Sequence, residues 1–162
     1  MSFVLARLKG SGVPRVRELP MASSTSFTKG ALLVVNNSGQ FAECAANPTA
    51  VAAVAMSPAG TDATGLNHTG RIEFPPNVMG GVAVQDEVWF SAEFVGDLPA
   101  NPGASYGVTK GSDGVWRVDF DKDGTGENPP AAVVKYQAPW DDGVITRNRV
   151  FVTFIPSVAS II

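Results

Sequence analysis

Short runs of alternating apolar and polar residues, separated by turn-forming residues, are the feature that most limits the folds open to this chain. The first clear run is EVWFSAEF at 87–94, in which every second residue from Val88 to Phe94 is apolar. Side chains alternate between the two faces of a strand, so this pattern predicts a strand with one apolar face. A second run, YGVTKGSDGVWRVDF at 106–120, carries Asp113 and Gly114 at its centre. An Asp-Gly pair flanked by alternating residues predicts a β-hairpin.

The same reading extends along most of the chain. The segment GALLVVNNSGQFAECAA at 30–46 has a turn-forming Asn-Asn-Ser-Gly stretch between two apolar runs, which predicts another hairpin. We expect further strands in TAVAAVAMSP at 49–58, GRIEFPP at 70–76, AAVVKYQAP at 131–139 and NRVFVTFIP at 148–156. No helical period persists for three turns. The sequence therefore predicts an all-β protein, with an antiparallel β-barrel or β-tulip-like body of short hairpins.

The first 26 residues differ from the rest. They contain apolar residues, but Gly10, Gly12, Pro14 and Pro20 interrupt any long helix. We expect residues 1–26 to form an extended N-terminal arm with one or two short strands. Residues 27–162 would form the barrel-like body, which ends in an apolar tail.

Composition excludes several classes of function. Charged residues make up 17% of the chain, against about 25% in typical soluble domains. The net charge is −3 and the 12 Lys and Arg residues are scattered, so nucleic acid is not expected as a partner. No apolar run is long enough for a signal peptide or a membrane span. We therefore expect a protein that is made in a cytoplasm and does not bind a membrane.

The chain is poor in catalytic and metal-binding residues. It has one cysteine, Cys44, and one histidine, His68, which cannot supply a usual zinc site. Cys44 stands among alanines, and we expect a buried thiol that acts as a small apolar side chain. The sequence has no phosphate-binding loop and no nucleophile elbow. We expect no enzymatic activity and no cofactor.

Two acidic stretches are candidates for metal binding or acid–base chemistry. The stretch from Asp119 to Gly124 has the D-x-D-x-D-G opening of a calcium loop, but its twelfth position is Pro130 where a glutamate is needed. We expect a solvated acidic loop there and no metal. The neighbouring residues Asp141 and Asp142 precede a glycine, and this combination favours a turn over acid–base chemistry.

Apolar residues in unusual places point instead to contacts between molecules. Trp89 shares the polar face of its strand with glutamates and a serine, so it either lies under a second layer or contacts another subunit. Both ends of the chain are apolar, and each either packs on the chain's own body or on a neighbour. The candidate contact residues are Phe3, Val4, Leu5, Leu8, Trp89, Trp140, Ile161 and Ile162.

The order of these elements resembles a known family. The progression SFTKGALLVVNNSGQFAECAANPTAVAAVAMSPAGT at 26–61, the hairpin at 106–120 and the closing NRVFVTFIPS are similar to the small head decoration, or cement, proteins of tailed bacteriophages. The resemblance implies a compact β-barrel or β-tulip body that is often assembled in threes. It also implies a position on the outside of the shell, where such proteins clamp neighbouring major capsid subunits.

Three hypotheses about function follow. The first is a non-enzymatic structural virion protein, a homotrimer on the outer capsid surface whose partner is the major capsid protein. The second is a carbohydrate-binding or receptor-binding β-module of a phage particle, because exposed tryptophans flanked by carboxylates also occur in sugar sites. An enzyme such as an unusual glycan hydrolase comes third.

Overall fold

All regular secondary structure in the described part of the chain is β-strand. The computed structural model describes residues 2–8, 16–20, 27–49, 51–55, 69–73, 88–123, 133–139 and 148–155. Its strands are β1 (Val4–Leu8), β2 (Val16–Pro20), β3 (Leu32–Val35), β4 (Phe41–Glu43), β5 (Ala53–Ala55), β6 (Thr69–Glu73), β7 (Val88–Val95), β8 (Ser105–Lys110), β9 (Trp116–Asp119), β10 (Val134–Pro139) and β11 (Arg149–Phe154). The described residues contain no helix, and the predicted all-β class is confirmed.

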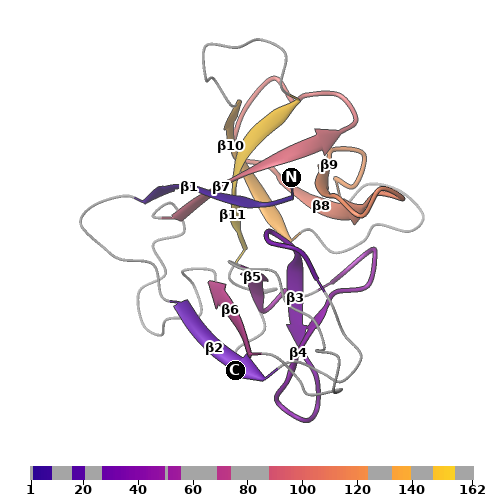
Figure 1. Ribbon diagram of the computed structural model, residues 1–162. Helices are drawn as coiled ribbons and strands as arrows, with labels where there is room; N and C mark the ends of the chain where they lie inside the picture. Colours follow the sequence, from indigo (N-terminus) through magenta and orange to yellow (C-terminus); the bar gives the residue numbers. More distant parts are fainter. Residues whose placement is uncertain are drawn as a thin grey trace.

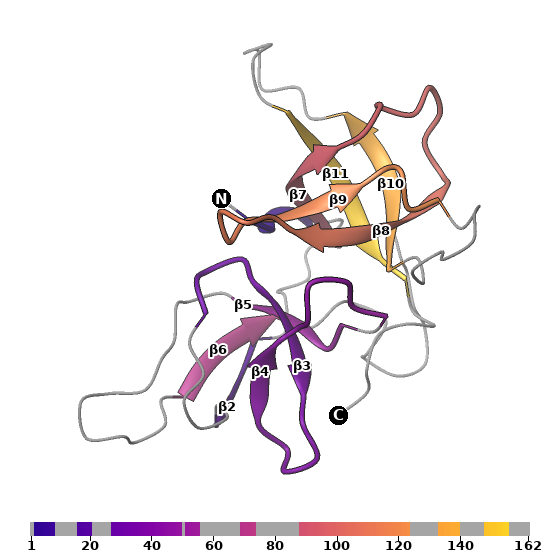
Figure 2. The same cartoon turned by 90° about the vertical axis from the view of Figure 1, so that its right-hand side faces the viewer.

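Five strands form a closed barrel. Their order is β7–β11–β10–β8–β9, and β9 returns to pair with β7. This last pairing, between residues 93–95 and 117–119, is parallel, whereas the other neighbours in the barrel are antiparallel. We call it the barrel seam. Figures 1 and 2 show the five strands wrapped around a common interior in the upper part of the molecule. The predicted barrel is confirmed, but it consists of β7 to β11 only, and its seam is parallel where antiparallel pairing was expected.

Strand β1 lies beside the seam. It pairs antiparallel with β7 in a register that places Val4 opposite Ser91 and Leu8 opposite Val88. Strand β11 pairs with residues 90–93 of β7, so β7 has β11 along one edge and shares the other edge between β1 and β9. Figure 1 shows β1 running across β7 on the outside of the barrel. β7 therefore has three partners, two of them end to end.

The remaining strands form a second, five-stranded sheet in the order β2–β6–β5–β3–β4, with every pairing antiparallel. It lies below the barrel in Figures 1 and 2. Residues 31–33 and 51–55 are all buried, as expected for apolar runs that are covered on both faces. Their side chains join those of the barrel in one continuous core.

Both hairpins predicted from turn residues are confirmed. In the turn between β8 and β9, the Asp113 carboxylate accepts a hydrogen bond from the Val115 amide, and Gly114 has a φ of 79°. In the turn between β3 and β4, Asn36 plays the same part through Oδ1, and Gly39 has a φ of 73°. Asparagine and aspartate favour such turns because their side chains bond backbone amides two residues further on.

The barrel interior is filled by its own side chains. The apolar residues of the barrel that are at most 8% exposed are Phe90, Ala92, Tyr106, Val108, Trp116, Val118, Phe120, Val134, Tyr136, Val150, Val152 and Phe154. The Phe120 ring touches three other rings, with centroid distances of 5.2 Å to Phe94, 4.8 Å to Tyr106 and 5.5 Å to Tyr136. A barrel this small has room for side chains and little else.

Residues 1–26, for which one or two short strands are predicted, contain two, and each pairs within the chain's own sheets. Strand β1 pairs with β7, and β2 pairs with β6. Phe3, just before β1, is 1% exposed, and its ring centroid lies 5.6 Å from that of Phe154. The Phe3 amide also donates to the carbonyl of Gly30, which precedes β3. The start of the chain thus links the barrel to the second sheet.

Gly30 gives the first prediction. Its φ of 89° is unfavourable for any other residue, and a Cβ there would lie 2.5 Å from the Phe3 carbonyl oxygen. Gly39 has a similar φ, but a Cβ there would meet nothing within 4 Å. We expect Gly39→Ala to lower the free energy of unfolding by about 1–2 kcal/mol, the cost of a left-handed alanine. Gly30→Ala should cost about 1–3 kcal/mol more, because the contact forces a backbone shift.

Denaturant unfolding, followed by tryptophan fluorescence, measures the free energy of unfolding of both variants. Equal losses at the two glycines would contradict the close approach of the N-terminal segment to Gly30.

Candidate functional site

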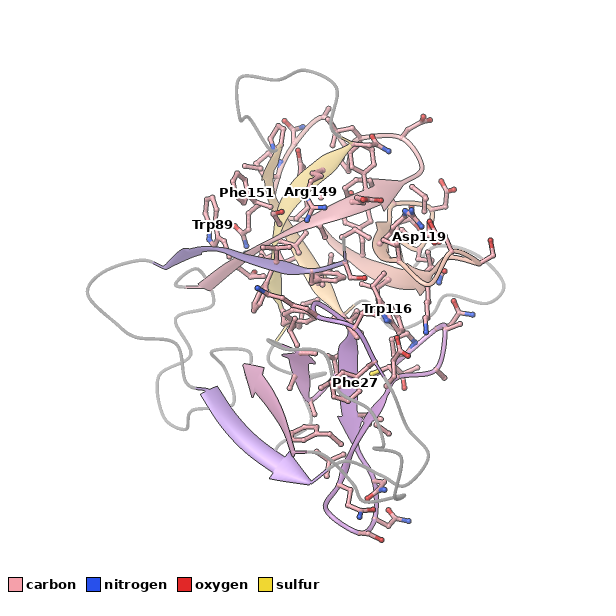
Figure 3. All side chains as sticks on the ribbon, in the orientation of Figure 1. Phe27, Trp89, Trp116, Asp119, Arg149 and Phe151 are labelled. Atoms are coloured by element: carbon pink, nitrogen blue, oxygen red, sulfur yellow. The ribbon has the colours of Figure 1, made fainter. Side chains whose placement is uncertain are left out.

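An aromatic pair lies on the outer face of the barrel. The Trp89 and Phe151 ring centroids are 5.5 Å apart, on the neighbouring strands β7 and β11. Both side chains are half-buried. Figure 3 shows the two rings side by side on the outside of the barrel, away from the filled interior. Trp89 therefore lies neither in the barrel interior nor fully in solvent, and it carries an apolar surface that Phe151 extends.

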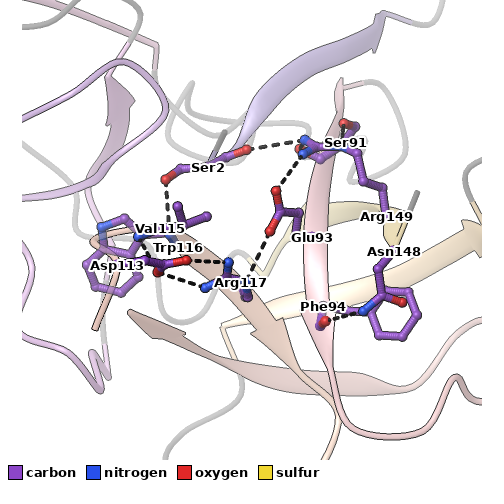
Figure 4. Close-up of polar contacts among 10 residues, drawn as sticks. All are labelled: Ser2, Ser91, Glu93, Phe94, Asp113, Val115, Trp116, Arg117, Asn148 and Arg149. Carbon is purple, nitrogen blue, oxygen red and sulfur yellow. Dashed lines mark hydrogen bonds and ion pairs between the residues drawn. The ribbon is translucent and has the colours of Figure 1, made fainter. Parts of the chain in front are cut away.

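Charged side chains cover the barrel seam. Arg117 of β9 donates through Nε to Glu93 of β7 at 3.0 Å, and its two terminal nitrogens form a fork with Asp113 at 3.0 and 2.7 Å. Figure 4 shows this chain of contacts. The hydrogen bonds from Arg117 hold the pKa of the Asp113 carboxyl well below its usual range. The same hydrogen bonds raise the pKa of Arg117. Strands β7 and β9 are thus held together by side chains as well as by backbone.

Arg149 of β11 joins this network to the N-terminal segment. Its guanidinium donates to the hydroxyl and to the carbonyl oxygen of Ser91, each at 2.9 Å, and to the Ser2 carbonyl oxygen at 3.2 Å. One of its nitrogens also lies 3.8 Å from the Glu93 carboxylate. The Ser2 hydroxyl accepts a hydrogen bond from the Trp116 amide at 2.9 Å. Ser2 therefore lies just before the start of β1 and contacts the first residue of β9.

A second polar cluster lies where the barrel meets the second sheet. The carboxylate of Glu43, in β4, accepts a hydrogen bond from the Trp116 indole at 2.8 Å. It also forms an ion pair with the Lys110 ammonium at 2.8 Å. These groups border an open hollow of about 250 Å³ that is lined by Phe27, Thr28, Glu43, Lys110 and Gly114. The Glu43 carboxylate and the Lys110 ammonium at this hollow are paired with each other. The cluster acts as a bridge between the two sheets.

Cys44 lies beside this bridge and is buried. Burial, together with the negative charge of Glu43, raises the pKa of the Cys44 thiol to about 12. A nucleophilic cysteine needs the opposite environment, which stabilises the thiolate. The prediction that Cys44 is a buried apolar side chain is confirmed.

The acidic stretch after β9 contains its own cation. The Lys122 ammonium lies 3.8 Å from the Asp119 carboxylate, and it donates to the Val108 carbonyl at 2.9 Å and to the Asn47 side chain. Asp119 also accepts a hydrogen bond from the Asp121 amide. No three His, Cys, Asp or Glu side chains in the described residues gather closely enough to hold a metal ion. Lys122 supplies positive charge to Asp119 and ties it to β8.

The predicted contact residues meet different outcomes. Phe3 is in the chain's own core, so this side chain is no longer a candidate for contact with a neighbour. Val4 is half-buried, and the backbones of Leu5 and Leu8 pair with β7. Trp89 remains a candidate. Trp140, Ile161 and Ile162 lie outside the described residues, as do His68, Pro130, Asp141 and Asp142.

Sequence reasoning missed the seam network and the Glu43–Lys110–Trp116 bridge. Their members are far apart in sequence, and Trp116 and Glu43 are separated by 73 positions. The alternating pattern did place Glu93 on the polar face of its strand. Only the pairing of β7 with β9 brings these two residues together.

Comparison of the chain with protein-family models, with curated proteins and with solved structures finds no match in any of the three. Among the described residues there is no helix long and apolar enough to cross a membrane.

The environment of Cys44 predicts slow thiol chemistry. At pH 8 we expect a thiol reagent to label the folded protein far more slowly than the protein in denaturant. Below pH 9.0, the ordinary thiol pKa, the thiol is protonated in the folded and the unfolded state, so its contribution to stability does not change with pH. Between pH 9.0 and about 12 the unfolded state loses its proton first, so stability falls as the pH rises.

Rapid labelling of the folded protein would contradict this environment. Cys44→Ala is the control for the pH effect, because this variant should lack the part of the alkaline decline that comes from the thiol.

Lys122 gives a separate prediction. Lys122→Met keeps an apolar stem beside Gly107 but leaves the Val108 carbonyl and the Asp119 carboxylate without the ammonium. We expect a loss of about 1.5–3 kcal/mol in the free energy of unfolding, the range for hydrogen bonds to charged groups. The matched control is Lys29→Met at an exposed position, with an expected change within about 0.5 kcal/mol. Equal stability of the two variants in denaturant unfolding would overturn the role given to Lys122.

Proposed function

We propose that this chain is a non-enzymatic structural protein of a virus particle that binds the outer surface of a capsid and bridges neighbouring major capsid subunits. The proposal rests on the resemblance to phage head decoration proteins and on one structural observation. The barrel interior is filled by the chain's own side chains, so recognition is left to the outer surfaces. A filled β-barrel of this kind suits a protein that functions by binding other proteins through its outer surface.

The charges of the described residues support a structural role. Those of the seam network and of the Glu43–Lys110 pair are engaged with one another. Catalytic carboxylates and bases need instead a free position toward a substrate and a perturbed pKa near the working pH. Here the paired charges hold strands and sheets in place. A clamp needs such rigidity, because ordering a loose surface on binding costs affinity.

The outer aromatic pair is the surface that we assign to the contact. Tryptophan and phenylalanine are enriched in protein–protein interfaces, and truncated tryptophans there often cost 2 kcal/mol or more. Trp89 and Phe151 lie on two hydrogen-bonded barrel strands, so their spacing is fixed by the fold. We propose that this pair packs against the major capsid protein.

The test is sedimentation with empty shells of the phage that encodes the protein. We expect the wild-type chain to pellet with the shells, and the double variant Trp89→Ala, Phe151→Ala to bind about 30-fold more weakly, which corresponds to about 2 kcal/mol. The matched control is Leu98→Ala, which removes an exposed apolar side chain elsewhere on the barrel. Circular dichroism should show that both variants remain folded.

Other outcomes would decide against the proposal. A wild-type protein that stays in the supernatant, yet is retained on a glycan array, would favour the carbohydrate-binding hypothesis. Equal binding of the double variant and the Leu98 control would remove the aromatic pair from the contact while leaving capsid binding in place.

A further inference from the structure

We propose that the hollow between the barrel and the second sheet binds one uncharged sugar ring, through a carboxylate oxygen of Glu43 and the ammonium of Lys110. The ligand class is a pyranose at the end of a glycan, recognised by two adjacent hydroxyl groups. The inference goes beyond capsid binding, because the described lining of the hollow includes neither Trp89 nor Phe151.

The Glu43 carboxylate keeps one oxygen for a ligand. The Trp116 indole and the Lys110 ammonium both contact Oε1, each at 2.8 Å. Among the described residues, no group donates a hydrogen bond to the other oxygen, Oε2, and this atom retains contact with solvent. Glu43 lines the hollow. Its Oε2 atom is therefore an acceptor that a ligand in the hollow can use.

The Lys110 ammonium keeps donors for the same ligand. An ammonium has three N–H groups, and within the described part of the chain its acceptor is Glu43 Oε1. The Lys110 side chain is 31% exposed. Thr28 is exposed at the same hollow and adds a hydroxyl, which both donates and accepts. The hollow thus presents an acceptor, a donor and a hydroxyl group within a small area.

The two opposite charges favour a ligand without net charge. The Glu43 and Lys110 charges lie side by side, so a charged ligand that is attracted by one of them is repelled by the other. Adjacent hydroxyl groups avoid this conflict, because one donates to Oε2 while the next accepts from the ammonium. Hydrogen bonds to ionised groups are also stronger than those between neutral groups. Adjacent hydroxyl groups with fixed spacing are the common feature of sugar rings.

The size of the hollow matches a single ring. Its volume is about 250 Å³, below the range of about 300–1,000 Å³ for pockets that take larger ligands. Phe27, which is 5% exposed, supplies apolar lining for the C–H groups of the ring. A Cβ at Gly114 would meet nothing within 4 Å, so the space over this part of the lining is open. The rest of a longer glycan can therefore extend into solvent.

The two charged groups are held in place by the fold. Glu43 is bonded to the indole of Trp116, which is 0% exposed. Lys110 ends β8, and its backbone amide donates to the Ala46 carbonyl. Figure 3 shows Trp116 above Phe27, where the barrel meets the second sheet. Groups that are ordered before binding lose less entropy when the ligand arrives.

The test is a titration of the purified protein, followed in its assigned proton–nitrogen NMR spectrum. The probes are the methyl α-pyranosides of D-glucose, D-galactose and D-mannose. We expect at least one of them to shift the signals of the Trp116 indole N–H and the Gly114 amide. The Kd should be on the order of 1 mM, because one ring makes few contacts.

Two variants and a matched control test the residues of the site. Lys110→Met removes the ammonium but keeps an apolar stem, and it should raise the Kd about 10-fold. Thr28→Val removes the hydroxyl at similar volume and should raise the Kd about 3-fold. The control is Lys135→Met, at a half-buried lysine of β10 that is not part of the described lining, and it should leave the Kd unchanged.

The absence of shifts with all three sugars would overturn the proposal. So would equal Kd values for Lys110→Met and Lys135→Met. Sodium acetate is the charged probe, and shifts of the same signals by acetate but by no sugar would mark an anion site instead. None of these results bears on shell binding, because no capsid protein is present.

Discussion

Strand β7 needs backbone hydrogen-bond partners along both of its edges, and the rest of the structure depends on this constraint. An eight-residue strand in the centre of a fold must bond its amides and carbonyls throughout. One edge is met by β11, and the other is divided between β9 and β1. The division closes the barrel with β9 and brings the start of the chain into the core with β1. Ser2 lies at the point where the two meet.

Side-chain charge reinforces this arrangement. Glu93, Arg117 and Arg149 come from the three barrel strands β7, β9 and β11. The Arg117–Glu93 contact crosses the seam, and Arg149 approaches Glu93 from β11 on the other side of β7. The Glu43–Lys110–Trp116 bridge does the same between the barrel and the second sheet. Single exposed ion pairs contribute little, but half-buried groups with several partners hold a geometry more firmly. The outcome is a β-body whose polar groups maintain its shape, with an aromatic pair on its outer face.

Local patterns account for much of what was predicted correctly. The alternation in 87–94 identified the buried Phe90 and Ala92, and the Asp-Gly and Asn-Asn-Ser-Gly stretches located two hairpins, because turns and strand faces depend on neighbouring residues. The burial of Cys44 also followed from its small apolar neighbours. The outcome for Phe3 did not follow, since an apolar residue near a chain end fits its own core as well as a neighbour's surface. Trp89 was singled out as unusual, and the structure places it half-buried beside Phe151, a neighbour that the sequence pattern did not indicate.

The sequence by itself determined the all-β class, the strand faces and the turns, because each is decided by residues that are close along the chain. Tertiary structure alone decided the closure of the barrel through the parallel pairing of β7 with β9, and the joining of Ser2 to Trp116 and Arg149 across more than a hundred residues. Strand order and long-range contacts depend on which edges and apolar faces are left to be paired once the local elements exist. That choice is made by the packing of the whole core, and no short stretch of sequence contains it.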